Sequence, residues 1–400
     1  MRAKVLILCL VILGAGGYVL HLYSLQRRPP GPDRIPFVKW TKTFDRPGFY
    51  TSPIVGDDGS LYIGSEEMYS LDPSSAVRWE FRVDLRDLVA GGLLQDEAKN
   101  IYFATMNKVY SLSPAGLKRW ETSCREPQTA LDDKGSTFDG NRLYTMCGQN
   151  FAALDKEDGT VLWTIPALDS ESTAVMLRDG TLLFVRYRQM FAVDRDGKTI
   201  WKYPQAPYAT LSGPAQDTYI DTPIAVGPDE TLYAGSRFSK FAALDPHGTV
   251  KWTFDSGEHE GFRTSPVVES DGTVVAISVR DVVYAFAPDG TVSWKFRLPK
   301  TINASRHAAP IIGSDGTIYI LAERMVIALS AQGKIIWQLP LQGTTIGSPA
   351  LAPDGTLYVA TAEQIIYAVQ TGSHGLMQSF WPKYQHDSSN SGRTMGVNDK

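Results

Sequence analysis

Short apolar runs that alternate with turn residues fill the chain from about residue 50 onward. Each run spans four to six residues, is rich in Val, Ile, Leu and Tyr, and is bounded by Gly, Pro, Asp or Ser. Residues 265–294, SPVVESDGTVVAISVRDVVYAFAPDGTVSW, contain four such runs. Apolar runs of this length, with β-branched residues between turn signals, predict β-strands. We therefore expect an all-β fold.

The turn residues recur at fixed places within each unit. An Asp-Gly pair separates the first two predicted strands at Asp58-Gly59, Asp179-Gly180, Asp271-Gly272, Asp315-Gly316 and Asp354-Gly355. This dipeptide is a strong hairpin signal, and the turn that we expect has positive φ at both central residues. A second glycine separates the last two strands, four residues before a tryptophan, at Gly116, Gly159, Gly197, Gly248, Gly290 and Gly333, with Ser75 at that place in the first unit.

The nine tryptophans form one regular series. They stand at positions 40, 79, 120, 163, 201, 252, 294, 337 and 381, at intervals of 38 to 51 residues. A repeat of this length indicates propeller blades or helical arrays. The 35 glycines and 24 prolines exclude the helical alternative. We predict an eight-bladed β-propeller of four-stranded antiparallel blades, preceded by one N-terminal hydrophobic helix.

The tryptophans have two interpretations. An indole can support a flat quinone cofactor, but a cofactor on the propeller axis needs an aromatic ring on the innermost strand. The spacing places the indoles in the outermost strand of each blade, which favours packing between blades. The predicted packing residues are Trp79, Trp120, Trp163, Trp201, Trp252, Trp294, Trp337 and Trp381. We expect residues 37–44, which resemble one more outer strand, to pair with the last blade and close the ring.

The N-terminus has the composition of a targeting segment. Residues 5–25 contain no Asp, Glu, Lys or Arg, and a helix of this length can span a bilayer. We favour an uncleaved anchor because the apolar run continues to Tyr23, while cleavage after Ala15-Gly16-Gly17 stays open. The expected organisation is a signal-anchor or signal peptide (1–27), a Pro-rich spacer (28–36), the propeller (37–394) and a C-terminal tail (395–400).

Charge and cysteine content exclude several function classes. The formal net charge of −4 gives the chain no general affinity for nucleic acid. The three cysteines do not have metal-binding spacing, which excludes zinc and iron–sulfur sites. Cys124 and Cys147 are predicted to lie on the same face of the propeller. They form either a disulfide or two unrelated buried thiols.

The strand order of a propeller blade places its connections on two opposite faces. In an up-and-down blade with strands A to D, the A–B and C–D turns share one face, and the D–A and B–C connections share the other. We call these the turn face and the loop face. The loop face has the longer and more varied connections, including residues 203–221, so we expect function there.

Basic residues gather on the predicted loop face. They are Arg186, Arg188, Arg237, Arg263, Arg280, Arg306, His307 and Arg324. Guanidinium groups bind carboxylates or phosphates through paired N–H donors, so these residues form a candidate anion-binding or partner-binding surface. The alternative is a solvated rim in which the arginines pair with neighbours such as Asp281 or Glu323.

Two stretches carry a family resemblance. The pattern Ala-x-Asp-x-x-x-Gly-x-x-x-Trp at residues 153–163, shortened by one at 243–252, resembles the tryptophan-docking repeat of PQQ-type (quinoprotein-like) propellers. The ending at residues 380–392 also resembles the chain ends of such proteins. The family includes quinoprotein dehydrogenases, the propeller lipoprotein of the outer-membrane-protein assembly complex, and surface proteins. Its dehydrogenases are implied to use a quinone, calcium and a disulfide between adjacent cysteines, and no two cysteines are adjacent here.

These observations favour a binding protein over an enzyme. We expect a non-catalytic, monomeric, extracytoplasmic scaffold propeller, tethered to a membrane by its N-terminus, with protein partners in the cell envelope and a role in envelope protein assembly. No catalytic, metal-binding or cofactor-binding residue is assigned. The alternatives are a PQQ-dependent quinoprotein oxidoreductase, which would also need calcium, and a surface carbohydrate-binding or adhesion propeller.

Overall fold

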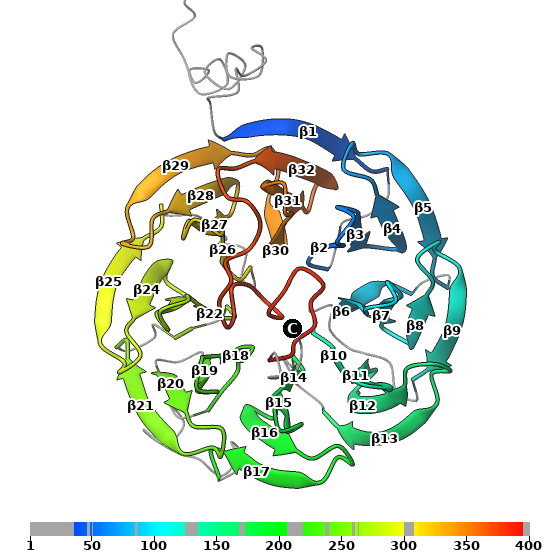
Figure 1. Cartoon of the computed structure of the whole chain (residues 1–400), viewed down its shortest axis with the longest axis horizontal. Helices are drawn as coiled ribbons and strands as arrows, with labels where there is room; N and C mark the ends of the chain where they lie inside the picture. Colours follow the sequence, from blue (N-terminus) through cyan, green and yellow to red (C-terminus); the bar gives the residue numbers. More distant parts are fainter. Residues whose placement is uncertain are drawn as a thin grey trace, which may run out of the picture.

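Eight four-stranded sheets stand around a common centre (Figure 1). The computed structural model describes residues 36–45, 49, 51–84, 87–124, 135–167, 173–205, 219–236, 240–257, 261–262, 264–299 and 308–394. Within these ranges all 32 regular elements are β-strands. The predicted eight-bladed propeller of antiparallel four-stranded blades is therefore confirmed. The predicted N-terminal helix lies outside the described residues.

The strands of the first four blades follow each other in sequence from the centre outward. Blade 1 contains β2 (Ile54–Val55), β3 (Leu61–Gly64), β4 (Glu67–Leu71) and β5 (Val77–Arg82). Blade 2 contains β6 (Val89–Gln95), β7 (Ile101–Thr105), β8 (Lys108–Leu112) and β9 (Lys118–Ser123). Blade 3 contains β10 (Thr137–Asp139), β11 (Arg142–Cys147), β12 (Asn150–Asp155) and β13 (Val161–Pro166). Blade 4 contains β14 (Val175–Met176), β15 (Leu182–Arg186), β16 (Gln189–Val193) and β17 (Thr199–Tyr203).

The next three blades repeat this order, and the last one differs in its outer strand. Blade 5 contains β18 (Ala225–Val226), β19 (Leu232–Gly235), β20 (Lys240–Leu244) and β21 (Val250–Asp255). Blade 6 contains β22 (Val267–Val268), β23 (Val274–Ile277), β24 (Val282–Phe286) and β25 (Val292–Arg297). Blade 7 contains β26 (Ile311–Ile312), β27 (Ile318–Ala322), β28 (Met325–Leu329) and β29 (Ile335–Pro340). Blade 8 contains β30 (Thr345–Leu351), β31 (Thr356–Thr361), β32 (Ile365–Gln370) and, outermost, β1 (Phe37–Thr43).

The N-terminal strand closes the ring, as expected for residues 37–44. Strand β1 pairs antiparallel with β32, from Phe37 opposite Gln370 to Thr43 opposite Ile365. Blade 8 therefore takes its three inner strands from the C-terminal part of the chain and its outer strand from the N-terminal part. Because the two ends share one sheet, neither is left as an unpaired edge within the ring.

Each outer-strand indole of seven blades bonds to the next blade. The Nε1 groups of Trp40, Trp79, Trp120, Trp163, Trp201, Trp252 and Trp294 donate to the carbonyl oxygens of Pro73, Pro114, Lys156, Arg195, Pro246, Pro288 and Ala331, at 2.8–3.1 Å. Every acceptor lies in a C–D turn. The indole therefore fixes the spacing between adjacent blades.

The glycine of the C–D turn makes room for this indole. Gly333, with φ +73°, lies so close to Trp294 that an added Cβ would come within 2.5 Å of the ring. The corresponding glycines of blades 2 to 6 face their indoles in the same way. Ser75 takes this position in blade 1 with φ +81°, which an L-residue adopts only at a cost.

Trp381 does not pack between blades from an outer strand, so the prediction for this residue is wrong. Trp381 lies outside the strands, in the C-terminal segment, and its side chain is fully buried near the hub. Trp40 on β1 is the outer-strand indole of blade 8 instead. The regular spacing misleads here because the sequence series runs through to Trp381, whereas ring closure takes the last outer strand from the beginning of the chain.

The Asp-Gly turns differ from the predicted type. Positive φ occurs at Gly59, Gly180, Gly272, Gly316 and Gly355, but the preceding aspartates are not left-handed. Each of these aspartates instead accepts a hydrogen bond at Oδ1 from the backbone N–H two residues later, as Asp271 does from Thr273 at 2.9 Å. The side chain thus stabilises the turn, which needs only one left-handed residue.

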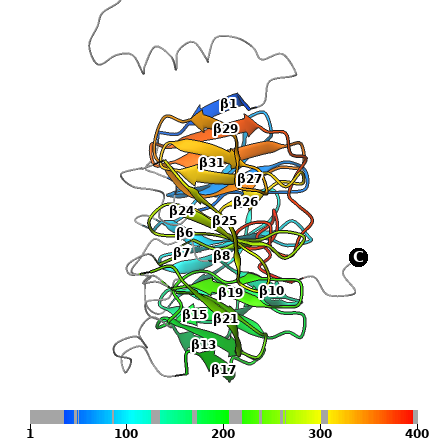
Figure 2. The same ribbon diagram turned by 90° about the vertical axis from the view of Figure 1, so that its left-hand side faces the viewer.

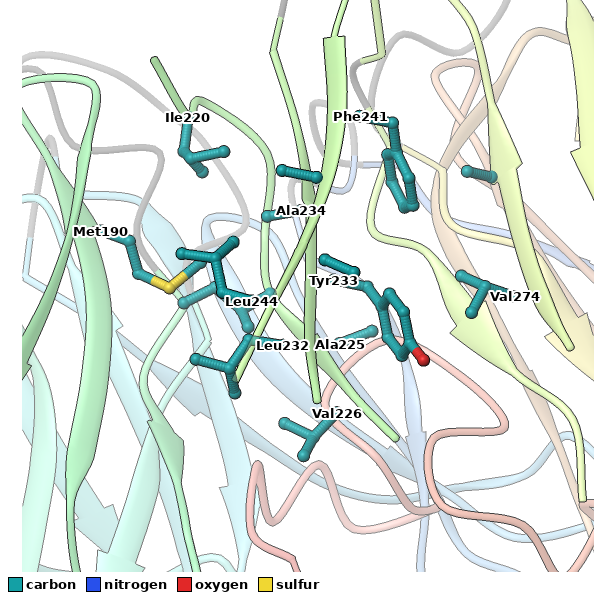
Figure 3. Close-up of a cluster of buried hydrophobic side chains, with 14 of the residues drawn as sticks. Met190, Ile220, Ala225, Val226, Leu232, Tyr233, Ala234, Phe241, Leu244 and Val274 are labelled. Carbon is teal, nitrogen blue, oxygen red and sulfur yellow. The ribbon is translucent and has the colours of Figure 1, made fainter. Parts of the chain in front are cut away.

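Apolar side chains from adjacent blades form shared cores. One cluster combines Met190 of blade 4, Tyr233 and Phe241 of blade 5, and Val274 of blade 6, all fully or almost fully buried (Figure 3). Strands β3, β4, β7 and β19, among others, are buried along their whole length, while outer strands such as β25 alternate between half-buried and exposed positions. Both faces of the inner strands therefore contact protein.

Residues 376–394, which we call the hub segment, cross the centre of the ring after β32 (Figure 1). The edge-on view places this segment toward one side of the disc (Figure 2). Its carbonyl oxygens at Ser388, Ser389, Gly392, Trp381 and Pro382 accept hydrogen bonds from the backbone N–H groups of Val55, Gln95, Met176, Val268 and Ile312. These donors stand at the ends of innermost strands just before A–B turns, so the hub segment closes the turn-face end of the hub.

Two charged side chains, the buried Lys383 and the half-buried Asp387, organise the hub segment internally. Lys383 is almost completely buried, and its Nζ donates to the carbonyl oxygens of Tyr384 and Asp387 at 2.8 and 3.0 Å and to Asn390 Oδ1. Burial alone would raise the pKa of Asp387, but hydrogen bonds and charge from His386, together with bonds from Ser391, lower it to about 2. Local hydrogen bonds of the hub segment therefore hold Lys383 and the ionised carboxylate of Asp387 in place.

A buried glutamate follows one of the strands that hold the hub segment. Glu269 is 6% exposed, and its Oε1 has no hydrogen-bond partner. Burial, with a smaller contribution from the charge of Asp271, raises the pKa of Glu269 to about 7. The preceding residue, Val268, donates its N–H to Trp381 O and accepts from Ser379 Oγ. An uncharged Glu269 therefore suits this position better than a carboxylate.

Replacing Gly333 by alanine should disturb the contact between blades 6 and 7. We expect the Gly333→Ala variant to lose about 1–3 kcal/mol of unfolding free energy beyond the cost of the left-handed backbone, because the new Cβ overlaps Trp294. Urea unfolding followed by tryptophan fluorescence measures this loss. Gly180→Ala is the matched control, since Gly180 has φ +85° but nothing within 4 Å of an added Cβ. Equal losses in the two variants would contradict the indole packing.

Replacing Glu269 by glutamine should stabilise the protein at alkaline pH. The pKa of Glu269 is higher in the folded state than its usual value of 4.5, so its contribution to stability is complete below pH 4.5 and is lost as the pH rises through about 7. We expect Glu269→Gln to melt on the order of 2–4 °C above the parent protein at pH 8, with the difference disappearing at pH 4.5. Calorimetry at both pH values tests this.

The exposed Glu97, in the A–B turn of blade 2, provides the control for that measurement. Glu97→Gln removes a negative charge from the same face without changing a buried group. A pH-dependent gain of equal size in both variants would show that net charge, and not burial of Glu269, causes the effect.

Candidate functional site

The described arginines of the predicted basic surface all lie on B–C turns. Arg186 and Arg188 belong to the β15–β16 turn of blade 4, Arg280 to the β23–β24 turn of blade 6, and Arg324 to the β27–β28 turn of blade 7. Their blades are spread over part of the ring, and only Arg186 and Arg188 share a hairpin. Arg237, Arg263, Arg306 and His307 lie outside the described residues.

The arginines of blades 6 and 7 are exposed. Arg324 forms an ion pair with Glu363 across 3.5 Å, and both side chains are largely in solvent. The ion-pair partner is thus on blade 8, and not the neighbouring Glu323. Arg280 is exposed, and its carbonyl oxygen accepts a hydrogen bond from Arg297 Nη1 at 3.3 Å. An exposed ion pair of this kind contributes little to stability, so both arginines suit a solvated rim.

Arg186 has a very different environment. The Cζ atom of Arg186 lies 4.9 Å from the ring centre of Tyr187 and 4.8 Å from that of Phe191. Its Nε is fully buried without a hydrogen-bond partner, and among the described residues its guanidinium has no hydrogen bond or ion pair. Burial lowers the pKa of Arg186, although the group stays charged at neutral pH. Two aromatic contacts therefore hold a partly desolvated cation.

The hairpin that carries Arg186 is fixed from several sides. Arg186 pairs with Gln189 across the turn, and Tyr187 and Arg188 at its tip have φ of 49° and 61°. Gln189 Nε2 donates to Pro204 O at 2.6 Å. The backbone N–H of Ile220 donates to Arg188 O at 3.0 Å. Both ends of the connection from blade 4 to blade 5 thus hold this turn.

A stack of aromatic rings packs against the Arg186 hairpin. The rings of Phe151 and Phe184 are stacked with centres 4.4 Å apart, and those of Phe184 and Phe191 with centres 5.8 Å apart. Phe191 in turn contacts the Arg186 guanidinium. The stack crosses from blade 3 to blade 4, so the position of Arg186 depends on packing between these blades.

We call Arg186, Tyr187, Arg188, Phe191 and Tyr219 the Arg186 site. Tyr219 belongs to it because Arg188 Cζ lies 5.2 Å from its ring centre. The sequence predicts the two arginines as surface residues of this face, but not the three aromatic rings. A sequence signal existed for Tyr187, which stands between the two arginines. Phe191 and Tyr219 could be added only after the hairpin and the end of the blade 4 to blade 5 connection were placed in space.

A disulfide lies on the same face. Cys124 and Cys147 are bonded, with their Cα atoms 5.1 Å apart. Cys124 follows β9 of blade 2 and Cys147 ends β11 of blade 3, so the bond joins two adjacent blades at the loop face. Its Cys147 side is buried. Within the described part of the chain no group of three or more His, Cys, Asp or Glu side chains could hold a metal ion.

The fold and this site define a closed, eight-bladed propeller with a basic aromatic site on its loop face. A family model described as outer membrane protein assembly factor BamB matches residues 105–252 and 192–373. The two matches together cover more than half of the chain, and the chain therefore belongs to this family of PQQ-like propellers. No curated protein matches the sequence.

Solved structures share the architecture at low sequence identity. BamB from Moraxella catarrhalis is 16% identical, with a TM-score of 0.67 over 84% of this chain and 100% of that one. The C-terminal WD40 domain of Sif2 is 13% identical, with a TM-score of 0.65 over 84% and 100%. The computationally designed Ika8 protein is 11% identical, with a TM-score of 0.61 over 82% and 98%. At these identities the likeness concerns the fold alone.

Breaking the disulfide should loosen the contact between blades 2 and 3. We expect the double variant Cys124→Ser/Cys147→Ser to lose about 3 kcal/mol of unfolding free energy, because the bond closes a loop with a sequence separation of 23. Urea unfolding with and without reductant measures the loss, and the double variant should no longer respond to reductant. Alkylation of both cysteines in the native protein without reductant would contradict the bond.

Proposed function

We propose that this protein is a non-catalytic binding scaffold of the cell envelope that holds protein partners on its loop face and takes part in envelope protein assembly. Membership in the family of the assembly factor BamB supports this role. The fold alone supports no particular chemistry, since propellers serve many functions. Residues particular to this chain therefore have to identify the binding face.

The Arg186 site is the observation that carries the proposal. Its guanidinium is partly buried and has no hydrogen bond or ion pair to the residues that the structure describes. A polar group of this kind costs free energy unless a partner satisfies it. A partner that docks on the loop face would provide the missing bonds. The cost in the free protein is then repaid on binding.

The closed end of the hub supports the choice of face. The hub segment occupies the turn-face end and takes up the N–H groups of five innermost strands there. Residues 381–386 at its middle are all buried, including Trp381, Lys383 and Tyr384. The A–B turns on this face are short and alike. The connections of varied length, the disulfide and the Arg186 site are all on the loop face. A specific partner would therefore bind there.

The proposed location is extracytoplasmic. The disulfide between Cys124 and Cys147 supports it, because such bonds persist in oxidising compartments. The composition of residues 5–25 supports a membrane tether, with residues 28–36 as a spacer. We also propose a monomeric propeller, which the pairing of β1 with β32 supports by closing the ring within one chain.

Site-specific cross-linking tests which face binds partners. A photo-reactive residue at Arg280, exposed on the loop face, should give discrete adducts with envelope proteins in intact cells. The same residue at Gln332, exposed in the C–D turn of blade 7, is the matched control for the turn face and should give none. Adducts from Gln332 alone, or equal sets from both positions, would overturn the loop-face assignment.

A further inference from the structure

Within the described part of the chain, Arg186 combines partial burial with the lack of a counter-ion, unlike six other arginines. Six arginines of the described residues form ion pairs: Arg78 with Asp58, Arg82 with Glu67 and Glu80, Arg119 with Glu157, Arg142 with Asp196, Arg195 with Asp139, and Arg324 with Glu363. Among the residues that the structure describes, Arg186 has only the rings of Tyr187 and Phe191 near its charge. It is also more buried than Arg324, whose side chain is 61% exposed.

The contacts of the guanidinium determine which of its atoms a ligand can reach. Both rings lie within cation–π distance of Cζ. Nε is fully buried and unbonded, whereas Nη1 and Nη2 are not among the fully buried, unbonded atoms and have no hydrogen bond to the described residues. These two terminal nitrogens are therefore accessible to solvent. They present two parallel N–H groups at the end of a side chain that its aromatic neighbours hold in place.

Two parallel donors with one positive charge match a carboxylate. A carboxylate has two oxygens in one plane and a single negative charge, and it forms paired bonds with a guanidinium. A phosphate carries up to two negative charges, whereas Arg186 supplies one positive charge, and the other cation of the site, Arg188, packs against the ring of Tyr219. The partial desolvation of Arg186 strengthens such a pair, because the charge interaction is screened less than in water.

We propose that the Nη1 and Nη2 groups of Arg186 bind a side-chain carboxylate of an acidic peptide segment on the partner. This inference rests on the proposed function, since the segment belongs to a protein docked on the loop face. The charge of the blade 4 turn agrees with it: residues 185–190 carry Arg186 and Arg188 and no Asp or Glu, whereas Arg280 and Arg324 adjoin Asp281 and Glu323. An acidic segment is therefore attracted to this turn before the specific pair forms.

The experiment uses the full chain and a fluorescein-labelled peptide of six glutamates as the probe. Fluorescence anisotropy at physiological salt should show saturable binding. Arg186→Gln should weaken binding at least tenfold, and Arg186→Lys, which keeps the charge and loses the paired donors, at least fivefold. Arg324→Gln is the matched control: that arginine shares the loop face but already has Glu363, and its loss should change affinity less than twofold.

A stability measurement separates binding from a structural role. Because the guanidinium of Arg186 has no hydrogen bond or ion pair to the described residues, Arg186→Gln should melt at or above the temperature of the parent. The hexaglutamate peptide should raise the melting temperature of the parent and leave that of Arg186→Gln unchanged. A clear loss of stability in Arg186→Gln without peptide would instead identify a structural residue and overturn the proposal.

The binding, competition and cross-linking experiments each have an outcome that would overturn a proposal. Equal affinity of the parent and Arg186→Gln for the peptide would overturn the carboxylate site. Stronger competition by inorganic phosphate than by glutarate at equal ionic strength would overturn the ligand class. If the peptide fails to bind while cross-links from position 280 persist, the carboxylate assignment is wrong and the loop-face scaffold stands. If those cross-links are also absent, both proposals are wrong.

Discussion

The contact between an outer-strand indole and the C–D turn of the next blade is the interaction on which this fold depends. A bulge in the outer strand precedes it: Ala285 lies opposite Trp294 and the next residue, Phe286, opposite Val292, so Ser293 has no partner. The same shift occurs in the other blades, at Ser70/Leu71 in blade 1 for example. A bulge rotates the strand locally, and this rotation brings the indole to the neighbouring turn.

Ring closure uses the same contact. Trp40 on β1 bonds to Pro73 of blade 1, while β1 itself completes blade 8 beside β32. Strand β1 therefore connects the last blade to the first: a ladder of backbone bonds joins it to blade 8, and its indole joins it to blade 1.

The hub is stabilised differently, because the innermost strands leave backbone N–H groups there without a partner in their own sheets. The hub segment satisfies five of these groups with its own carbonyl oxygens.

The two faces of the propeller differ in how their charged side chains are neutralised. On the turn face it is compensated within the chain: Asp58, Asp229 and Asp354 of the A–B turns pair with Arg78, Lys251 and Lys39, the bulged residues before the indoles. On the loop face, Arg186 is held by aromatic rings and has no counter-ion among the described residues. Ion pairs of the A–B turns thus neutralise charge within the chain on the turn face, whereas the partly buried Arg186 cation gives a partner of opposite charge a chemical reason to bind at the loop face.

The sequence by itself determined the number of blades, the strand order within them and the positions of the turns. These follow from local chemistry that every repeat carries: an Asp-Gly turn, a second glycine and an indole four residues later. It also placed Arg186, Arg188, Cys124 and Cys147 on one face, because the face follows from strand direction alone.

Tertiary structure decided the positions and contacts that depend on residues distant in the chain. It moved Trp381 to the hub, gave its outer-strand role in blade 8 to Trp40, and paired Arg324 with Glu363, because ring closure and contacts between blades join residues whose separation in the chain carries no signal.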